Sequence, residues 1–178
     1  MKKRYLIIIF LMFLLMSSGG VIAQDDAGRF EIAVAVVVDI VDGDTYDVAY
    51  VSGGEGLPTR IEPYLINTPN QSPSGPFGGG MSDCFGEEAT AFATGVLLGQ
   101  TIWIEHQNRT RTQNFIERLL AFVFLDHTRE AMLQSILLSQ GLASVEVEHP
   151  EETIFLAKAI EAENNARDAD RGLWGACE

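Results

Sequence analysis

Oxygen-bearing side chains gather in the stretch RIEPYLINTPN, residues 60–70, where a strand-like run enters a turn. Pro69 fixes its own φ and biases Thr68 away from the helical region, so the turn presents polar groups. Such a turn could hold a metal ion and a phosphate. However, Asn67 and Asn70 are neutral where such a site usually has carboxylates, and Glu62 is acidic where a cation would help. The pattern is that of a metal-and-phosphate site with altered charges.

The first 23 residues have the composition of a secretory signal peptide. A basic start, KKR, precedes an apolar run over residues 5–16, and Val21-Ile-Ala23 is an acceptable cleavage signature. The apolar run is shorter than the roughly 20 residues that span a bilayer, although an uncleaved anchor remains the alternative. We therefore expect a secreted mature chain, residues 24–178, with no stable membrane insertion after cleavage.

The mature chain is strongly acidic. Removing the leader leaves nine basic residues against 25 acidic ones, a formal net charge of −16. This excludes a general binder of nucleic-acid backbones, which needs clustered Lys and Arg. A local basic groove is not excluded, because charges are screened beyond about 8 Å at physiological salt. The one basic cluster, Arg109, Arg111 and Arg118, lies in the segment QNRTRTQNFIER, for which a solvated loop is the favoured interpretation.

Two cysteines, Cys84 and Cys177, remain after cleavage. In an exported protein they predict a disulfide, worth roughly 4–5 kcal/mol in the chain-entropy model. Two unpaired thiols are the alternative. Two cysteines alone do not make a metal site.

Hydrophobic periodicity predicts five strands and three helices. The strands are two within residues 29–51 joined at the Asp-Gly turn 42–44, then 59–66, 101–106 and 119–126; the helices are 87–98, 131–141 and a last one between Pro150 and Gly172. This order predicts an α+β, mainly β fold in one domain, residues 24–178: a five-stranded OB-type barrel with three helices.

Six short stretches occur in a specific order along the mature chain. They are VDGDT (41–45), LINTP (65–69), CFGEEATAF (84–92), ERLLAFVFLD (117–126), QGLASV (140–145) and RGLWGAC (171–177). Together they resemble the staphylococcal nuclease-like (thermonuclease) family. The resemblance implies an OB barrel that hydrolyses DNA and RNA phosphodiesters with calcium. In that family a water attacks a metal-bound phosphate, a glutamate acts as base, and two arginines hold the phosphate.

The metal ligands that the resemblance implies are partly present. Asp44 matches the first carboxylate ligand, and Thr68 offers its backbone carbonyl. Asn67 occupies the second carboxylate position, where an amide oxygen can bind calcium but adds no charge. Together with Asp42 these residues predict a weak Ca²⁺ site. A plain hairpin turn at 42–44 is the alternative.

The catalytic positions depart further from the family's residues than the metal-ligand positions do. Asn70 stands where the family has its general-base glutamate, and Glu62 stands where it has its first arginine, whereas Arg118 keeps the second arginine. Losing a general base costs about 10²–10⁴ in rate, and losing one charge-stabilising donor costs about 10²–10³. The family's nucleotide-stacking tyrosines are replaced by Ile116, Val147 and His149.

Two compensations are conceivable. Arg60 lies two residues before Glu62 and on the same sheet face, about 7 Å along the strand, from which it could reach the phosphate. Glu62 could act as a relocated base; a structural salt bridge between Glu62 and Arg118 is the alternative. The sequence thus predicts a monomeric, exported nuclease-family domain of weak or altered activity on single-stranded nucleic acid. A catalytically inactive OB-fold binding module is the alternative.

Overall fold

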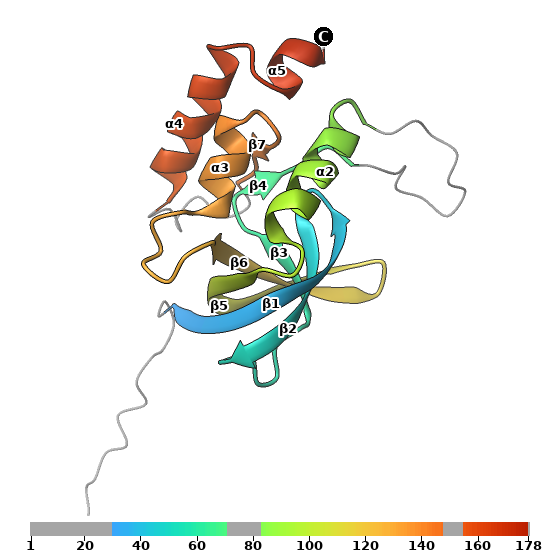
Figure 1. Ribbon diagram of the computed structural model, residues 1–178, viewed down its shortest axis with the longest axis vertical. Helices are drawn as coiled ribbons and strands as arrows, with labels where there is room; N and C mark the ends of the chain where they lie inside the picture. The colour runs from blue at the N-terminus through green and yellow to red at the C-terminus, as the bar shows by residue number, and fades with distance from the viewer. Residues whose placement is uncertain (1–29, 71–82, 148–154, 178) are drawn as a thin grey trace, which may run out of the picture.

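A computed structural model describes residues 30–70, 83–147 and 155–177 of the 178-residue chain (Figure 1). The signal peptide expected at residues 1–23 lies outside the described residues and stays a prediction. In the described part, a β-barrel forms one end of the molecule, and helices cover its other end. No helix in that part is both long and apolar enough to cross a membrane.

Five strands close the barrel in the order β1-β2-β3-β6-β5. Their bounds are β1 Glu31–Asp42, β2 Thr45–Ser52, β3 Arg60–Pro63, β5 Thr101–Gln113 and β6 Ile116–Phe124. β3 and β6 run parallel, whereas the other pairs are antiparallel. The predicted five-stranded OB-type barrel, and with it the α+β, mainly β class, is confirmed.

The barrel core follows from alternation along the strands. Ala33, Ala35 and Val37 of β1 are fully buried, whereas Ile32 and Val38, which flank them, are exposed. Helix α2 (Gly86–Leu97) packs on β1 and buries Ala89, Ala93 and Leu97 at helical spacing. The small side chains of Ala89 and Ala93 let the helix lie close to the barrel, and Ala89 lies beside the turn between β1 and β2.

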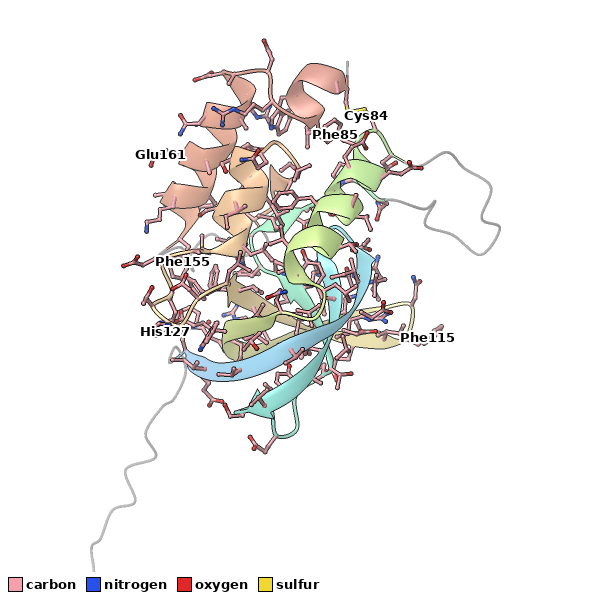
Figure 2. All side chains as sticks on the ribbon, viewed as in Figure 1. Cys84, Phe85, Phe115, His127, Phe155 and Glu161 are labelled. Carbon is pink, nitrogen blue, oxygen red and sulfur yellow. A yellow bond between two sulfur atoms is a disulfide. The ribbon has the colours of Figure 1, made fainter. Side chains whose placement is uncertain are left out.

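Three further helices lie beyond the barrel: α3 (Leu133–Ser139), α4 (Leu156–Arg167) and α5 (Leu173–Ala176). The three predicted helices correspond to α2, α3 and α4, and the four-residue α5 is additional. Cys84 and Cys177 form the predicted disulfide, with their Cα atoms 5.8 Å apart. It ties Cys84, two residues before α2, to Cys177, which directly follows α5; Figure 2 labels Cys84.

Two predicted elements were wrong in their bounds. Segment 107–118 is not a solvated loop, because β5 and β6 continue through it as a paired ribbon that turns at Asn114 and Phe115. Both turn residues have positive φ, and Phe115 points away from the barrel at the tip (Figure 2). The strand predicted over 59–66 ends at Pro63. Leu65 has a φ of 72°, and β4 (Ile66–Asn67) then pairs with β7 (Ser144–Val145) in a separate small sheet.

Candidate functional site

A polar pocket of about 540 Å³ opens between the β1–β2 turn, β3 and the β5–β6 ribbon. Its lining combines acids, two arginines and amides: Val41, Asp42, Asp44, Glu62, Asn67, Asn70, Arg111, Gln113, Asn114, Arg118 and Glu146. Of the predicted site residues, the pocket gathers all except Arg60 and Thr68, and Thr68 bonds directly to Asp44. Segments distant in the sequence therefore meet at one site, as the motifs predicted.

The turn between β1 and β2 depends on a glycine for steric reasons. A Cβ atom at Gly43 would lie 2.7 Å from the Thr68 hydroxyl and 2.9 Å from the Ala89 side chain. The Tyr46 hydroxyl donates to the Gly43 carbonyl at 2.5 Å, and the Asp44 N–H donates to the Asp42 carboxylate at 3.2 Å. The two hydrogen bonds hold the shape of the turn. Gly43 packs closely against Thr68, and the Asp44 carboxylate lies beside the Thr68 N–H.

Asp44 is a buried carboxyl group with few compensating partners. The Thr68 backbone N–H donates to its Oδ2 at 2.6 Å. Burial raises the pKa of Asp44 to about 8, with a further contribution from the negative charge of Asp42, while the Thr68 hydrogen bond acts in the opposite direction. The physical cause is desolvation, which disfavours the charged form. A nearby cation would favour the ionised form of this group.

The groups around Asp44 offer oxygen donors, which a hard cation prefers, but few of them are carboxylates. Asp42, Asp44 and Asn67 line one pocket, and Thr68 is held against Asp44. All of these offer oxygen, which calcium accepts in flexible geometry. Among the described residues, however, no three His, Cys, Asp or Glu side chains are grouped so that they could hold a metal ion. The oxygen donors are of the kind that calcium binds, but the described residues do not form a grouped metal site.

Glu62 is the centre of the pocket's ion-pair network. Its Oε2 accepts a hydrogen bond from Arg118 Nη1 at 3.0 Å, and its Oε1 accepts one from Arg111 Nη1. The side chains of Glu62, Arg118 and Arg111 are 7%, 13% and 29% exposed. The carboxylate therefore occupies a largely desolvated position between two guanidiniums. The structure contains the predicted salt bridge between Glu62 and Arg118, enlarged by a second arginine.

Arg118 is held by two hydrogen-bond partners. Besides Glu62, its Nη1 donates to the Thr45 hydroxyl at 3.1 Å, which connects it to the turn that carries Asp44. Its Nε is buried, and the described residues supply it with no hydrogen-bond partner. A buried donor without a partner costs about 1–3 kcal/mol, so this part of the Arg118 side chain destabilises the fold.

Asn70 lies at the edge of the pocket and is engaged by Asp83. Its backbone N–H and its side-chain Nδ2 both donate to Asp83 Oδ2, at 3.1 and 3.0 Å, and Asp83 N–H donates back to the Asn70 carbonyl at 3.0 Å. These bonds join the two chain ends that flank residues 71–82. An amide that donates in this way is not placed to accept a proton from water.

Arg60 pairs elsewhere. Its Nε and Nη2 donate to the two carboxylate oxygens of Asp47 on β2, both at 2.7 Å, and the two residues are register partners. This bidentate bond lowers the pKa of Asp47. The alternation of β3 correctly predicts the face of the sheet, but Arg60 is absent from the pocket lining, so its phosphate-binding role has no geometric support.

Two charged residues of the pocket lining, Arg111 and Glu146, were not assigned to the site by the sequence analysis. Arg111 bonds Glu62, and its Nη2 also reaches Glu146 Oε2 at 3.4 Å. The signal for Arg111 was present as a basic cluster, but its placement required the ribbon to be recognised. Of the positions that replace the stacking tyrosines, Ile116 and Val147 are exposed, and His149 lies outside the described residues.

The sequence model of the staphylococcal nuclease homologue family matches residues 60–176. This range covers more than half of the chain, so the protein belongs to this family. The match includes Glu62, Asn67, Asn70 and Arg118, whereas the turn with Asp44 precedes it. A search of curated proteins found no significant match.

Proposed function

We propose that this protein is an exported nuclease-family domain that hydrolyses phosphodiesters of single-stranded nucleic acid weakly, with calcium. The observation that carries the proposal is the pocket itself. It brings Asp44 and Asn67 next to Arg118, and a carboxylate, Glu62, neutralises the arginines that a phosphate requires. Phosphoryl transfer depends mainly on positioning and charge neutralisation, so a partly neutralised site supports a slow reaction.

The roles of the residues follow from their positions. Asp42, Asp44, Asn67 and the Thr68 carbonyl would hold calcium, which supplies positive charge that polarises the phosphoryl group. Arg118 would donate to a phosphate oxygen when the ligand replaces part of the hydrogen bonding between Arg118 and Glu62. Glu62 is the remaining candidate for a relocated base, because Asn70 cannot take a proton.

A catalytically inactive binding module is the second candidate. It is favoured by Asn70, because an amide cannot take a proton from water as a general base does, and its Nδ2 donates to Asp83. On this alternative the pocket binds its ligand without cutting it.

Export is part of the proposal and rests on the leader-like residues 1–23 and on the Cys84–Cys177 disulfide, which is typical of oxidising compartments. We also propose that the mature domain is a monomer. N-terminal sequencing of the protein recovered from the medium tests the cleavage after Ala23, and sedimentation tests the monomer.

The deciding experiment is cleavage of single-stranded DNA and RNA by residues 24–178, with calcium and with chelator. Arg118→Ala tests the site, and Arg109→Ala on the same ribbon is the matched control. Calcium-dependent cleavage that is lost in Arg118→Ala and kept in Arg109→Ala supports the enzyme. Cleavage that survives Arg118→Ala contradicts it, and no cleavage at all favours the binding module.

A further inference from the structure

The β5–β6 ribbon ends in a two-residue turn, Asn114 and Phe115. Gln113 and Ile116 are register partners on either side of it, and the two turn residues have φ values of 51° and 65°. Positive φ at both central residues is the mark of a type I′ hairpin turn, which favours Asn at the first of them and Gly at the second. Asn114 fits this preference, whereas Phe115 does not.

Phe115 is an unfavourable residue for this turn in two respects. Its backbone conformation is one that bulky residues rarely adopt, and its side chain is fully exposed and projects from the tip of the ribbon (Figure 2). A single exposed apolar side chain needs no explanation by itself. A fully exposed aromatic ring on a strained turn does, because packing gains nothing from it and such outliers cluster at functional sites. The ring is therefore placed for a contact outside the domain.

The turn is continuous with the polar pocket. Gln113 and Asn114, the two residues before Phe115, both line that pocket. Amide side chains of this kind can donate to and accept from the edges of nucleobases, and an exposed aromatic ring can stack on their faces. The rim of the pocket thus combines the two kinds of group that recognise an unpaired base.

Charge alone gives this pocket little attraction for a polyanion. Its lining holds four carboxylates and two guanidiniums, and Glu62 bonds both Arg111 and Arg118. A stacking contact depends on the face of a base and not on net positive charge. A single-stranded ligand can therefore gain affinity at the rim that the phosphates do not supply.

We propose that Phe115 is a stacking platform for an unpaired base of the single-stranded nucleic acid that is bound at the pocket. This inference rests on the proposed function and adds the residue that selects single strands. The positions of the family's stacking tyrosines hold Ile116, Val147 and His149, so Phe115 supplies the stacking surface from another position. A base within a duplex has both faces covered by its neighbours. Because every base has a π-face, the platform favours single strands without favouring a particular sequence.

The size of the exposed apolar surface favours a base over a larger partner. A specific protein interface buries about 800 Å² on each partner, and membrane binding grows with the apolar area that is buried. The tip offers one ring, followed by Ile116, which is 43% exposed. This is far less apolar surface than either partner needs, whereas one base covers one face of one ring.

Fluorescence anisotropy of labelled strands, measured in chelator so that none is cleaved, tests this inference. The probes are a short thymidine strand, the same strand with abasic residues, which keeps every phosphate, and the thymidine strand in a duplex. We expect Phe115→Gly to weaken binding of the thymidine strand at least about fivefold, which corresponds to the loss of a stack worth about 1 kcal/mol. Phe115→Trp should bind this strand at least as tightly as native protein. The abasic strand and the duplex should bind native protein more weakly, and Phe115→Gly should change abasic binding less than twofold.

Phe115→Gly also separates binding from folding. Glycine adopts positive φ without strain, so this variant should unfold at a urea concentration no lower than that of native protein. Val51→Ala is the control, because it shortens an exposed apolar side chain of β2 that does not line the pocket. It should bind the thymidine strand as native protein does.

The inference is overturned if native protein does not bind the thymidine strand, if Phe115→Gly binds it as tightly as native protein, or if Phe115→Gly weakens abasic binding equally. In the second case, a loss of binding to phosphatidylcholine vesicles or of self-association would assign the ring to a membrane or to a second copy. Native protein that binds the strand through Phe115 but does not cleave it with calcium contradicts the proposed activity and leaves this inference standing. Calcium-dependent cleavage that Arg118→Ala abolishes, together with unchanged binding by Phe115→Gly, gives the reverse result.

Discussion

Glu62→Gln should destabilise the protein through the two arginines that it leaves behind. Removing one partner of a buried ion pair costs about 3–5 kcal/mol, because the other charge stays desolvated. Arg118 is nearly buried, but Arg111 is 29% exposed and retains Glu146, so part of this penalty is relieved by water. Glutamine also keeps one acceptor oxygen. We therefore expect a loss of about 2 kcal/mol in the free energy of unfolding, below the range for a fully buried pair.

Urea unfolding at pH 7 and low salt measures this loss, with Glu105→Gln as the control. Glu105 is a buried carboxylate of β5 that pairs, within the described part of the chain, with one arginine, Arg129, whose side chain is 45% exposed. Its replacement should cost about 1 kcal/mol or less, because water solvates the arginine that is left behind. The reasoning is refuted if Glu62→Gln is as stable as the native protein, or if it loses no more stability than Glu105→Gln.

Three further perturbations test the scaffold. The Arg60 guanidinium holds the pKa of Asp47 below its usual value, so this pair stabilises the protein above about pH 4 and loses its effect as the pH falls through the lowered pKa. Asp47→Asn should therefore cost up to about 1 kcal/mol at pH 7 and progressively less as the pH falls below about 4 in urea titrations; a cost that does not fall with pH contradicts this. Gly43→Ala should destabilise by about 1–3 kcal/mol through overpacking, whereas Gly95→Ala, whose added Cβ meets nothing within 4 Å, should stabilise helix α2 by about 0.5–1 kcal/mol. The opposite ranking in thermal unfolding would contradict the packing. Replacing both disulfide cysteines with serine should cost about 2–5 kcal/mol, and an unchanged unfolding midpoint would show that the bond stabilises little.

The barrel was predictable because its signals are local. The β-branched runs on either side of Asp42-Gly43-Asp44 specify a hairpin, and Ala89 and Ala93 give helix α2 a periodic apolar face. The outer half of the β5–β6 ribbon was missed because both of its faces are polar or exposed, so burial leaves no alternation there. The end of β3 before Leu65 was missed because Leu65 has a positive φ although it is not a glycine, and the sequence gives no local signal for this conformation.

The motifs indicated which residues line the pocket, but they did not indicate which carboxylate pairs with which arginine. The motifs placed Asp44, Asn67 and Arg118 in one pocket, and the bond between Glu62 and Arg118 was foreseen as an alternative. Which carboxylate holds which arginine depends on cross-strand register, which a single strand does not encode. Hence Arg60 was expected near the phosphate but pairs with its register partner on β2.

The most direct test of the central claim is to restore the family's charges and measure hydrolysis of single-stranded DNA. The variant combines Glu62→Arg with Asn70→Glu, and Arg111→Gln removes the third guanidinium that would otherwise crowd the pocket. If the scaffold is intact and these charges limit its chemistry, the folded variant should cleave at least about 100-fold faster than native protein, with calcium only. If the variant is as stable as the native protein in urea unfolding but cleaves no faster, the account is contradicted.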